Sequence, residues 1–192
     1  MPDKKTKTSF FIISGPSGVG LDSIIEGLSA IMPIKRVITT STRAMRPGES
    51  NGHPYYFISS EEFLRKAGKN EFFEFAEEYN HKLYGVTHDE IKRAAASGKI
   101  VIWKVEYKGV VAIKRLMPET VAILINAPID SIENRLRERD KGASEEYFRE
   151  RMEYSREWLK HRDIYDYEVV NNADMLDKAI NDVAEIIKIH KK

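Results

Sequence analysis

The sequence predicts an α/β protein with three layers, α/β/α, in which helices cover both faces of a parallel β-sheet. The apolar run Ser9 to Ser14 lacks polar alternation, which is typical of a strand buried on both faces. From residue 87 onward, strand-like runs alternate with helical patterns, as expected when helices connect parallel strands. The composition, 42% hydrophobic and 32% charged residues in a chain of 192, fits a globular domain with a full core.

The amino-terminal half combines the first strand with several short elements. Apolar residues at helical spacing predict a helix over 24–31. A short helix is expected at 61–67, because Ser59 or Ser60 can cap its first turn. The β-prone runs of this half predict strands at 36–40, 55–58 and 71–79.

The carboxyl-terminal half shows a plainer alternation of longer elements. Its apolar runs predict strands at 100–105, 121–125 and 168–170. Its helical patterns predict helices at 87–96, 108–116, 129–139, 144–161 and 175–189. Two segments interrupt the alternation and are expected to be lobes inserted into one core. The expected single domain has a core at 8–36, 87–126 and 157–192, a lobe at 37–86 and a helical hairpin at 127–156.

Charge and composition exclude several classes of function. The formal net charge is +1, so neither nucleic acid nor a membrane surface is an expected partner. The chain has no cysteine, which excludes a disulfide framework, a thiolate metal site and a cysteine nucleophile. No apolar run approaches the roughly 20 residues of a membrane span, and no signal peptide is recognised behind Met1 to Lys7. A cytoplasmic monomer or homodimer is expected.

A glycine loop joins the first strand to the first helix. Gly15-x-x-x-x-Gly20 stands between strand and helix, which is the context of a phosphate-binding P-loop. In such a loop, backbone N–H groups point inward and the helix N-terminus adds positive potential. The alternative is a plain turn with convenient glycines. The candidate phosphate-binding residues are Gly15, Ser17, Gly18, Val19, Gly20, Leu21, Asp22 and Ser23.

The loop departs from the usual pattern in two residues. A working loop carries a lysine for the transferred phosphate and then a serine or threonine for Mg²⁺. Here these positions hold Leu21 and Asp22. Leucine cannot neutralise a phosphate, and an aspartate repels one unless a cation lies between them.

A second candidate anion site lies in residues 39–57. Arg43 and Arg46 stand three residues apart, followed by a glycine turn and Tyr55. Guanidinium groups bind phosphate bidentately, and tyrosine hydroxyls can complete the shell around its oxygens. The alternative for the two arginines is solvated surface charge.

Two further motifs follow, one around Glu74 and one around Tyr84. Together with the glycine loop and the arginine–tyrosine stretch, they resemble the guanylate kinase family from about Phe10 to Asn172. The resemblance implies a nucleoside monophosphate kinase that converts GMP to GDP, with ATP as co-substrate and Mg²⁺. By the same resemblance, the lobe binds GMP and the hairpin is a lid that closes over ATP.

The resemblance also implies how guanine is recognised. Glu74 would accept hydrogen bonds from N1 and the 2-amino group of guanine, whereas adenine would leave the carboxylate unpaired. Thr39 stands where the family usually has serine, and Val86 stands where serine or threonine is common. The residues implied in GMP binding are Thr39, Arg43, Arg46, Tyr55, Glu74, Tyr84 and Glu106.

A change of charge links the glycine loop to residues 98–106. This segment resembles the family pattern G-K-x-x-x-x-D-x-D, in which Glu106 keeps the second carboxylate and Lys104 replaces the first. The positive charge gained at Lys104 balances the charges changed at Leu21 and Asp22. One interpretation is a rewired site, in which Lys104 reaches the phosphates and Asp22 binds Mg²⁺. The other is a Lys104–Asp22 salt bridge that fills an inactive donor site.

The hairpin carries arginines that match family positions. Arg139 and Arg151 would neutralise the moving phosphoryl group, a role worth roughly 10³ to 10⁵ in rate. The alternative is that they pair with glutamates along the helix surface. Asn171 matches a family asparagine on the adenine side. The implied catalytic residues are Arg43, Lys104, Arg139 and Arg151.

Two other functions stay open at this point. Leu21 favours a GMP-binding module that has lost its chemistry and serves in sensing or protein interaction. Val86 favours a kinase that acts on another small phosphorylated substrate.

Overall fold

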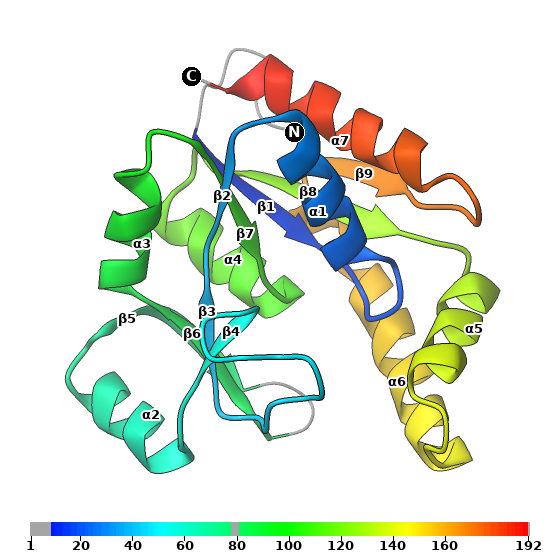
Figure 1. The fold of residues 1–192 in the computed structure, drawn as a ribbon, viewed down its shortest axis with the longest axis horizontal. Coiled ribbons are helices and arrows are strands. Elements are labelled where there is room, and N and C mark those ends of the chain that lie inside the picture. The colour runs from blue at the N-terminus through cyan, green and yellow to red at the C-terminus, as the bar shows by residue number, and fades with distance from the viewer. Residues whose placement is uncertain (1–8, 78–80, 192) are drawn as a thin grey trace.

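The structure, a computed structural model, describes residues 9–77 and 81–191. Its central sheet has five parallel strands in the order β2-β7-β1-β8-β9 (Figure 1). The strands are β1 (Phe10–Ser14), β2 (Ile34–Arg36), β7 (Ile100–Lys104), β8 (Val121–Asn126) and β9 (Tyr167–Val170). The predicted α/β class with a parallel sheet is confirmed.

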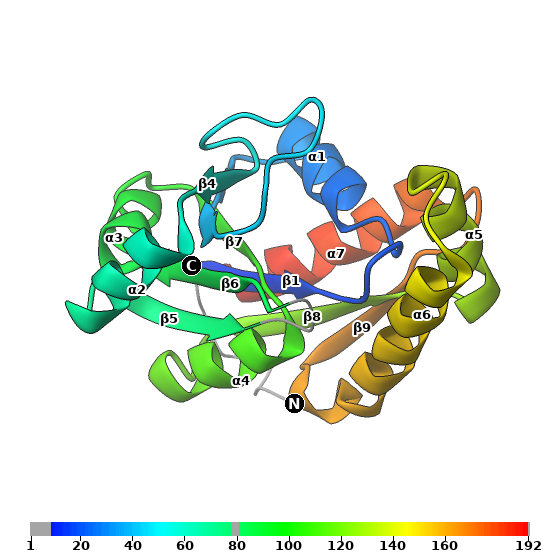
Figure 2. The ribbon, with the colours of Figure 1, turned by 90° about the horizontal axis from the view of Figure 1, so that it is seen from below.

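Apolar side chains of the central sheet alternate between two hydrophobic clusters. In β1, Phe11 and Ile13 belong to one cluster and Ile12 to the other, and all three are fully buried. Helices α1 (Leu21–Ile31) and α7 (Leu176–His190) cover one face, and α4 (Tyr107–Leu116) covers the other (Figure 2). Helix α3 (His88–Ala95) contacts two strands of a second sheet and adds Ala94 to the cluster around α4. Burial on both faces explains why β1 is a continuous apolar run.

A second sheet of four strands, in the order β4-β3-β6-β5, lies beside the first (Figure 1). Its strands are β3 (Thr39–Ser41), β4 (Tyr55–Phe57), β5 (Phe72–Glu77) and β6 (Leu83–Thr87). β3 pairs with β4 in parallel and with β6 in antiparallel orientation. The helix α2 (Ser60–Gly68) follows β4, and Ser59 caps it by accepting a hydrogen bond from the Glu62 backbone at 3.1 Å.

The expected strand at 36–40 is wrong, because the run belongs to two sheets. β2 ends at Arg36 in the central sheet, and β3 begins at Thr39 in the second sheet. Between them, the backbone N–H of Ile38 donates to the buried carboxylate of Glu90 at 2.7 Å. A backbone group bound to a side chain cannot join a strand ladder, so the strand is interrupted there.

Strand β6 is not predicted by the sequence pattern, because its middle residue is a glycine. A Cβ atom on Gly85 would lie 2.6 Å from the Cβ of Phe75, so the close approach of β5 requires glycine there. The neighbouring strand β5 ends at Glu77. The last two residues of the expected strand 71–79 lie outside the described residues.

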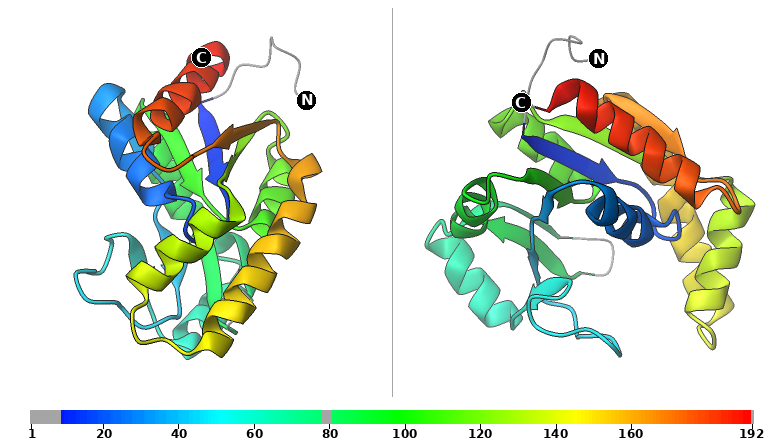
Figure 3. Two further views of the ribbon diagram at one scale, coloured as in Figure 1. Left: turned by 90° about the vertical axis from the view of Figure 1, so that its right-hand side faces the viewer. Right: turned by 45° about the horizontal axis from the view of Figure 1, so that its top comes forward.

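Two helices form a hairpin beside the carboxyl ends of the central strands. They are α5 (Ile129–Arg139) and α6 (Glu145–Lys160), which contact each other and lie side by side in Figure 3. Ser144 caps α6 by accepting a hydrogen bond from the Tyr147 backbone at 3.2 Å. A short 3₁₀ helix, η1 (Arg162–Ile164), then leads into β9. In the described part of the chain, every helix is too short or too polar to cross a membrane.

Candidate functional site

A cavity of about 440 Å³ lies at the carboxyl ends of β1 and β7. In open α/β sheets ligands gather at this edge. The loop after β1, the second sheet and the α5–α6 hairpin all contribute to its wall. The predicted site residues that line it are Gly15, Ser17, Gly18, Gly20, Leu21, Asp22, Ser23, Thr39, Arg43, Arg46, Tyr55, Glu74, Tyr84, Lys104, Glu106, Arg139 and Arg151. The structure brings them together, and the ligand that each contacts stays a prediction.

The glycine loop needs its glycines for steric reasons. A Cβ atom on Gly15 would lie 2.2 Å from the backbone oxygen of Ile125. Gly18 and Gly20 have φ angles of 94° and 89°, in the left-handed region that strains other residues. Gly20 precedes the first residue of α1, so the amino end of that helix is directed at the cavity. The loop has the geometry expected of an anion-binding turn.

Two predicted site residues, Val19 and Asn171, do not line the cavity; Val19 belongs to the loop but is buried in the core. Asn171 is 3% exposed, and its Nδ2 donates to the Val19 carbonyl at 2.8 Å. A Cβ atom on Gly20 would lie only 2.7 Å from that nitrogen. Asn171 therefore supports the loop from beneath, and its predicted contact with adenine stays a prediction.

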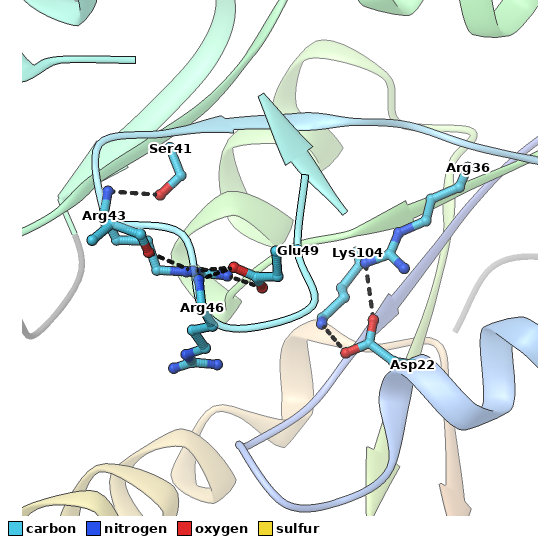
Figure 4. Close-up of polar contacts among 8 residues, drawn as sticks. Asp22, Arg36, Ser41, Arg43, Arg46, Glu49 and Lys104 are labelled. Atoms are coloured by element: carbon cyan, nitrogen blue, oxygen red, sulfur yellow. Dashed lines mark hydrogen bonds and ion pairs between the residues drawn. The ribbon is translucent and has the colours of Figure 1, made fainter. Parts of the chain in front are cut away.

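Asp22, at the start of α1, forms ion pairs with two basic side chains (Figure 4). Lys104 Nζ lies 2.8 Å from its Oδ2, and Arg36 Nη2 lies 2.9 Å from its Oδ1. Burial alone raises the pKa of the Asp22 carboxyl, but Lys104 and Arg36 outweigh burial and hold the pKa below its usual value. The Lys104–Asp22 ion pair of the second interpretation is present, and Arg36 is a partner that the sequence analysis did not predict.

Leu21 and Asp22 point to different environments, although both line the cavity. Leu21 packs against the hydrophobic cluster that contains α1 and α7. No group of three or more His, Asp or Glu side chains suited to a metal ion occurs among the described residues. Mg²⁺ commonly uses one or two carboxylates plus substrate phosphates, and the predicted binding of Mg²⁺ by Asp22 stays a prediction.

Arg43 is held in place by a glutamate and by aromatic rings. Its two terminal nitrogens bind the two carboxylate oxygens of Glu49, at 2.7 Å and 2.5 Å, as Figure 4 shows. Its guanidinium lies 5.0 Å from the ring centroid of Tyr55 and 5.2 Å from that of Phe57. Glu49 also accepts from the backbone N–H of Arg46 at 2.7 Å. Glu49 therefore organises the arginine pair, and sequence reasoning did not single it out.

Glu74 lies on β5 and points into the same cavity. Burial raises the pKa of its carboxyl from 4.5 to about 7. Thr39, on β3 of the same sheet, is 7% exposed. The rings of Tyr55 and Tyr84 pack edge to face, with their centroids 6.0 Å apart. A carboxyl in such a place can accept two N–H donors from a ligand and gains its charge when they arrive.

The α5–α6 hairpin contacts the glycine loop through arginines. Arg139 and Arg151 each donate to the hydroxyl of Ser17 at 3.2 Å. Asp140 binds Arg139 through two hydrogen bonds, at 2.9 Å and 2.7 Å, which lower the pKa of Asp140 to about 2. Both arginines line the cavity, and their predicted role at the transferred phosphoryl group stays a prediction.

Two further residues, Arg135 and Tyr154, connect the hairpin to the rest of the site. Arg135 donates to the carbonyl of Gly18 at 3.4 Å and to the carbonyl of Asn171 at 3.3 Å. Tyr154 on α6 donates to Glu106 at 2.6 Å. Arg135 belongs to the arginine-rich run that gives the hairpin its positive charge, but its contacts were not predicted because its partners lie far away in the sequence.

Comparisons with known proteins agree with this geometry. The model of the guanylate kinase family matches residues 7–190. A guanylate kinase of Buchnera aphidicola subsp. Schizaphis graminum is 39% identical over 92% of this chain and 86% of its own length. A guanylate kinase of Symbiobacterium thermophilum is 34% identical over 100% of this chain and 89% of its own.

A solved structure gives the same result for the fold. The crystal structure of guanylate kinase from Anaplasma phagocytophilum has a TM-score of 0.72 and 25% identity, and the match covers 96% of this chain and 86% of that one. The family match extends over nearly the whole chain, and the two relatives cover most or all of it at 39% and 34% identity. This chain belongs to the guanylate kinase family.

Proposed function

We propose that this chain transfers a phosphoryl group from ATP to the phosphate of GMP and forms ADP and GDP. The observation that carries the proposal is the single cavity shared by the glycine loop, the lobe around Glu74 and the hairpin arginines. Such a transfer needs no covalent intermediate, because alignment of two phosphates and stabilisation of charge account for most of the catalysis. Groups that can align two phosphates and groups that can stabilise charge both line this cavity.

The acceptor is chosen by Glu74 and the arginine pair. The ionised carboxylate of Glu74 accepts from N1 and the 2-amino group of guanine, while Arg43, Arg46, Tyr55 and Tyr84 bind the phosphate. Adenine leaves a buried carboxylate unpaired, which costs more than a missing contact on the surface. Val86 is fully buried in a hydrophobic cluster and is not part of the cavity wall, so it offers no basis for another substrate.

The donor site uses Lys104 in place of the lysine that the loop lacks. Lys104 lies at the carboxyl end of β7 and lines the cavity together with Leu21. Its pair with Asp22 is cheap to open, because the Asp22 side chain is 54% exposed and exposed ion pairs contribute about 0 to 1 kcal/mol. Charge-assisted hydrogen bonds to phosphate are stronger than that. Lys104 therefore exchanges Asp22 for the phosphates when ATP binds.

A Mg²⁺ ion bound with ATP would lower the repulsion between the phosphates. Asp22 is the residue that would hold it, once Lys104 has turned to the phosphates. Arg139 and Arg151 then face the transferred group from the hairpin side and exclude water as the hairpin closes.

A GMP-binding module without chemistry is the second candidate. One observation favours it: Asp22 is bound by both Lys104 and Arg36, so the charges at the donor site neutralise one another without a nucleotide. In such a module the lobe around Glu74 would still bind GMP.

A nucleotide panel separates the two candidates. Thermal shifts are recorded with GMP, dGMP, AMP and ATP·Mg²⁺, and ADP release is then followed with GMP and ATP·Mg²⁺ together. A kinase is stabilised by GMP and by ATP·Mg²⁺ but not by AMP, and releases ADP only when GMP is present. Stabilisation by GMP alone, without ADP release, contradicts the kinase and identifies the module.

A further inference from the structure

Asp22 uses its two oxygens for two different cations. Oδ2 binds Lys104 Nζ at 2.8 Å, and Oδ1 binds Arg36 Nη2 at 2.9 Å. The two cations come from the ends of neighbouring strands, because β2 pairs directly with β7. The Asp22 carboxylate therefore keeps one basic partner when the other leaves.

The two cations differ in their access to the cavity. Lys104 and Asp22 are among the residues that line the cavity, whereas Arg36 is not. In Figure 4, Lys104 Nζ lies on the side of Asp22 that faces Arg46 and Glu49, and Arg36 approaches from the other side. Within residues 9–77 and 81–191, Arg36 thus reaches the donor site through its pair with Asp22.

We infer that Arg36 is a positioning residue of the donor site, which holds Asp22 in place and neutralised while Lys104 turns to the phosphates of ATP. This inference rests on the proposed function, because it assigns Arg36 a task in the same exchange. Arg36 binds Oδ1 of Asp22, so the carboxylate keeps its orientation, with Oδ2 directed into the cavity, after Lys104 has left. That oxygen is then the one available to Mg²⁺.

The chemistry of the two side chains suits this division of work. Lysine carries a compact charge on a flexible stem with three rotatable donors, so it can change partners. Arginine is always charged and holds its donors in a rigid plane. Without Arg36, the departure of Lys104 would leave the Asp22 carboxylate unpaired beside the negatively charged phosphates, and the binding of ATP would have to overcome their repulsion.

Equilibrium binding tests the inference on the full chain. Calorimetry measures the Kd of ATP·Mg²⁺ for the wild type, Arg36→Ala, Asp22→Asn and the double variant. Arg36→Ala is expected to weaken binding about tenfold, and Arg36→Lys to give an intermediate Kd. In the Asp22→Asn background the same change of Arg36 has an effect of less than about twofold, because the carboxylate that it positions is gone.

Two controls accompany these variants. The Kd of GMP is unchanged in Arg36→Ala, because Arg36 does not line the cavity that GMP enters. Arg162→Ala also removes an arginine–carboxylate pair, with Glu168 at 2.6 Å, but one on η1 and β9. It leaves the Kd of ATP·Mg²⁺ as in the wild type.

Three results would overturn the inference. The first is an unchanged Kd of ATP·Mg²⁺ in both Arg36→Ala and Arg36→Lys, and the two variants together keep the test valid if one does not fold. The second is an equal loss in the Asp22→Asn background, since Arg36 would then act independently of Asp22. The third, a wild type that binds GMP but no ATP·Mg²⁺, contradicts the proposed function itself and is recognised without any variant.

Discussion

Glu74→Gln is the substitution with the most specific expected effect on stability. Burial raises the pKa of the Glu74 carboxyl from 4.5 to about 7, so the folded chain holds this proton more tightly than the unfolded chain. Stability from such a group is present at low pH and is lost as the pH rises from the unfolded pKa to the folded one. Glutamine has the same shape and no charge, so it avoids the loss.

The magnitude follows from the shift. A pKa raised from 4.5 to about 7 corresponds to about 3 kcal/mol of lost stability once the pH exceeds both values. The free energy of unfolding is measured with urea for the wild type and Glu74→Gln, at about pH 5 and about pH 8.5. The advantage of Glu74→Gln over the wild type should grow by about 2 to 3 kcal/mol between these two pH values. Subtracting the free energy of unfolding of the wild type from that of Glu74→Gln at each pH removes the contribution of the other titrating groups, which is the same in both proteins.

A pH-independent difference between the two proteins would refute this reasoning, because it would mean that Glu74 titrates alike in the folded and unfolded chains. Glu61→Gln, which removes a negative charge from the exposed surface of α2, is the matched control. Unfolding in the presence of GMP adds a second check. At high pH, GMP should make the wild type more stable than Glu74→Gln, since the ionised carboxylate of Glu74 then has two N–H partners.

Three further predictions concern the cavity. The KM for GMP in the wild type should rise about tenfold as the pH is lowered from about 8 to about 6, because Glu74 must lose its proton before guanine binds. Glu74→Gln should lack this part of the rise, because only the phosphate of GMP still titrates. Glu49→Gln loosens Arg43 and raises the KM for GMP about tenfold with the KM for ATP unchanged, which initial-rate kinetics checks. Gly20→Ala places a Cβ 2.7 Å from Asn171 Nδ2 at a φ of 89°, so urea unfolding should show a loss of at least about 1 to 2 kcal/mol, and a stability equal to wild type would disprove the steric requirement.

The sequence predicted the parts of the molecule whose signals are local. The apolar run of β1, its glycine turn and the amphipathic helices each carry their pattern within a few residues, and the structure has them close to the predicted positions. The contact between Lys104 and Asp22 was one of two interpretations of the charge balance, although the two residues are far apart in the chain. Local pattern, charge and the resemblance to the guanylate kinase family together located most of the cavity wall.

The parts that were missed depend on contacts that no local pattern records. The run at 36–40 has β-prone residues throughout, and only the bond from Ile38 to Glu90 divides it between two sheets. Strand β6 exists because β3 and β5 pair with it on both sides, and Gly85 reflects that crowding rather than a turn. Arg36 was overlooked because its importance comes from lying beside β7, which only the strand order reveals.

Lys104→Met provides the most direct measurement of the donor site. The kcat/KM for ATP is determined from ADP release in the presence of GMP for the wild type, Lys104→Met and Lys99→Met. Lys99 is the control, because it is exposed and precedes the opposite end of β7. If Lys104 has taken over the task of the missing lysine, Lys104→Met loses about 10²-fold in kcat/KM, Lys99→Met loses nothing, and Leu21→Lys restores part of the activity of Lys104→Met. Turnover of ATP by Lys104→Met at the wild-type rate would contradict that assignment.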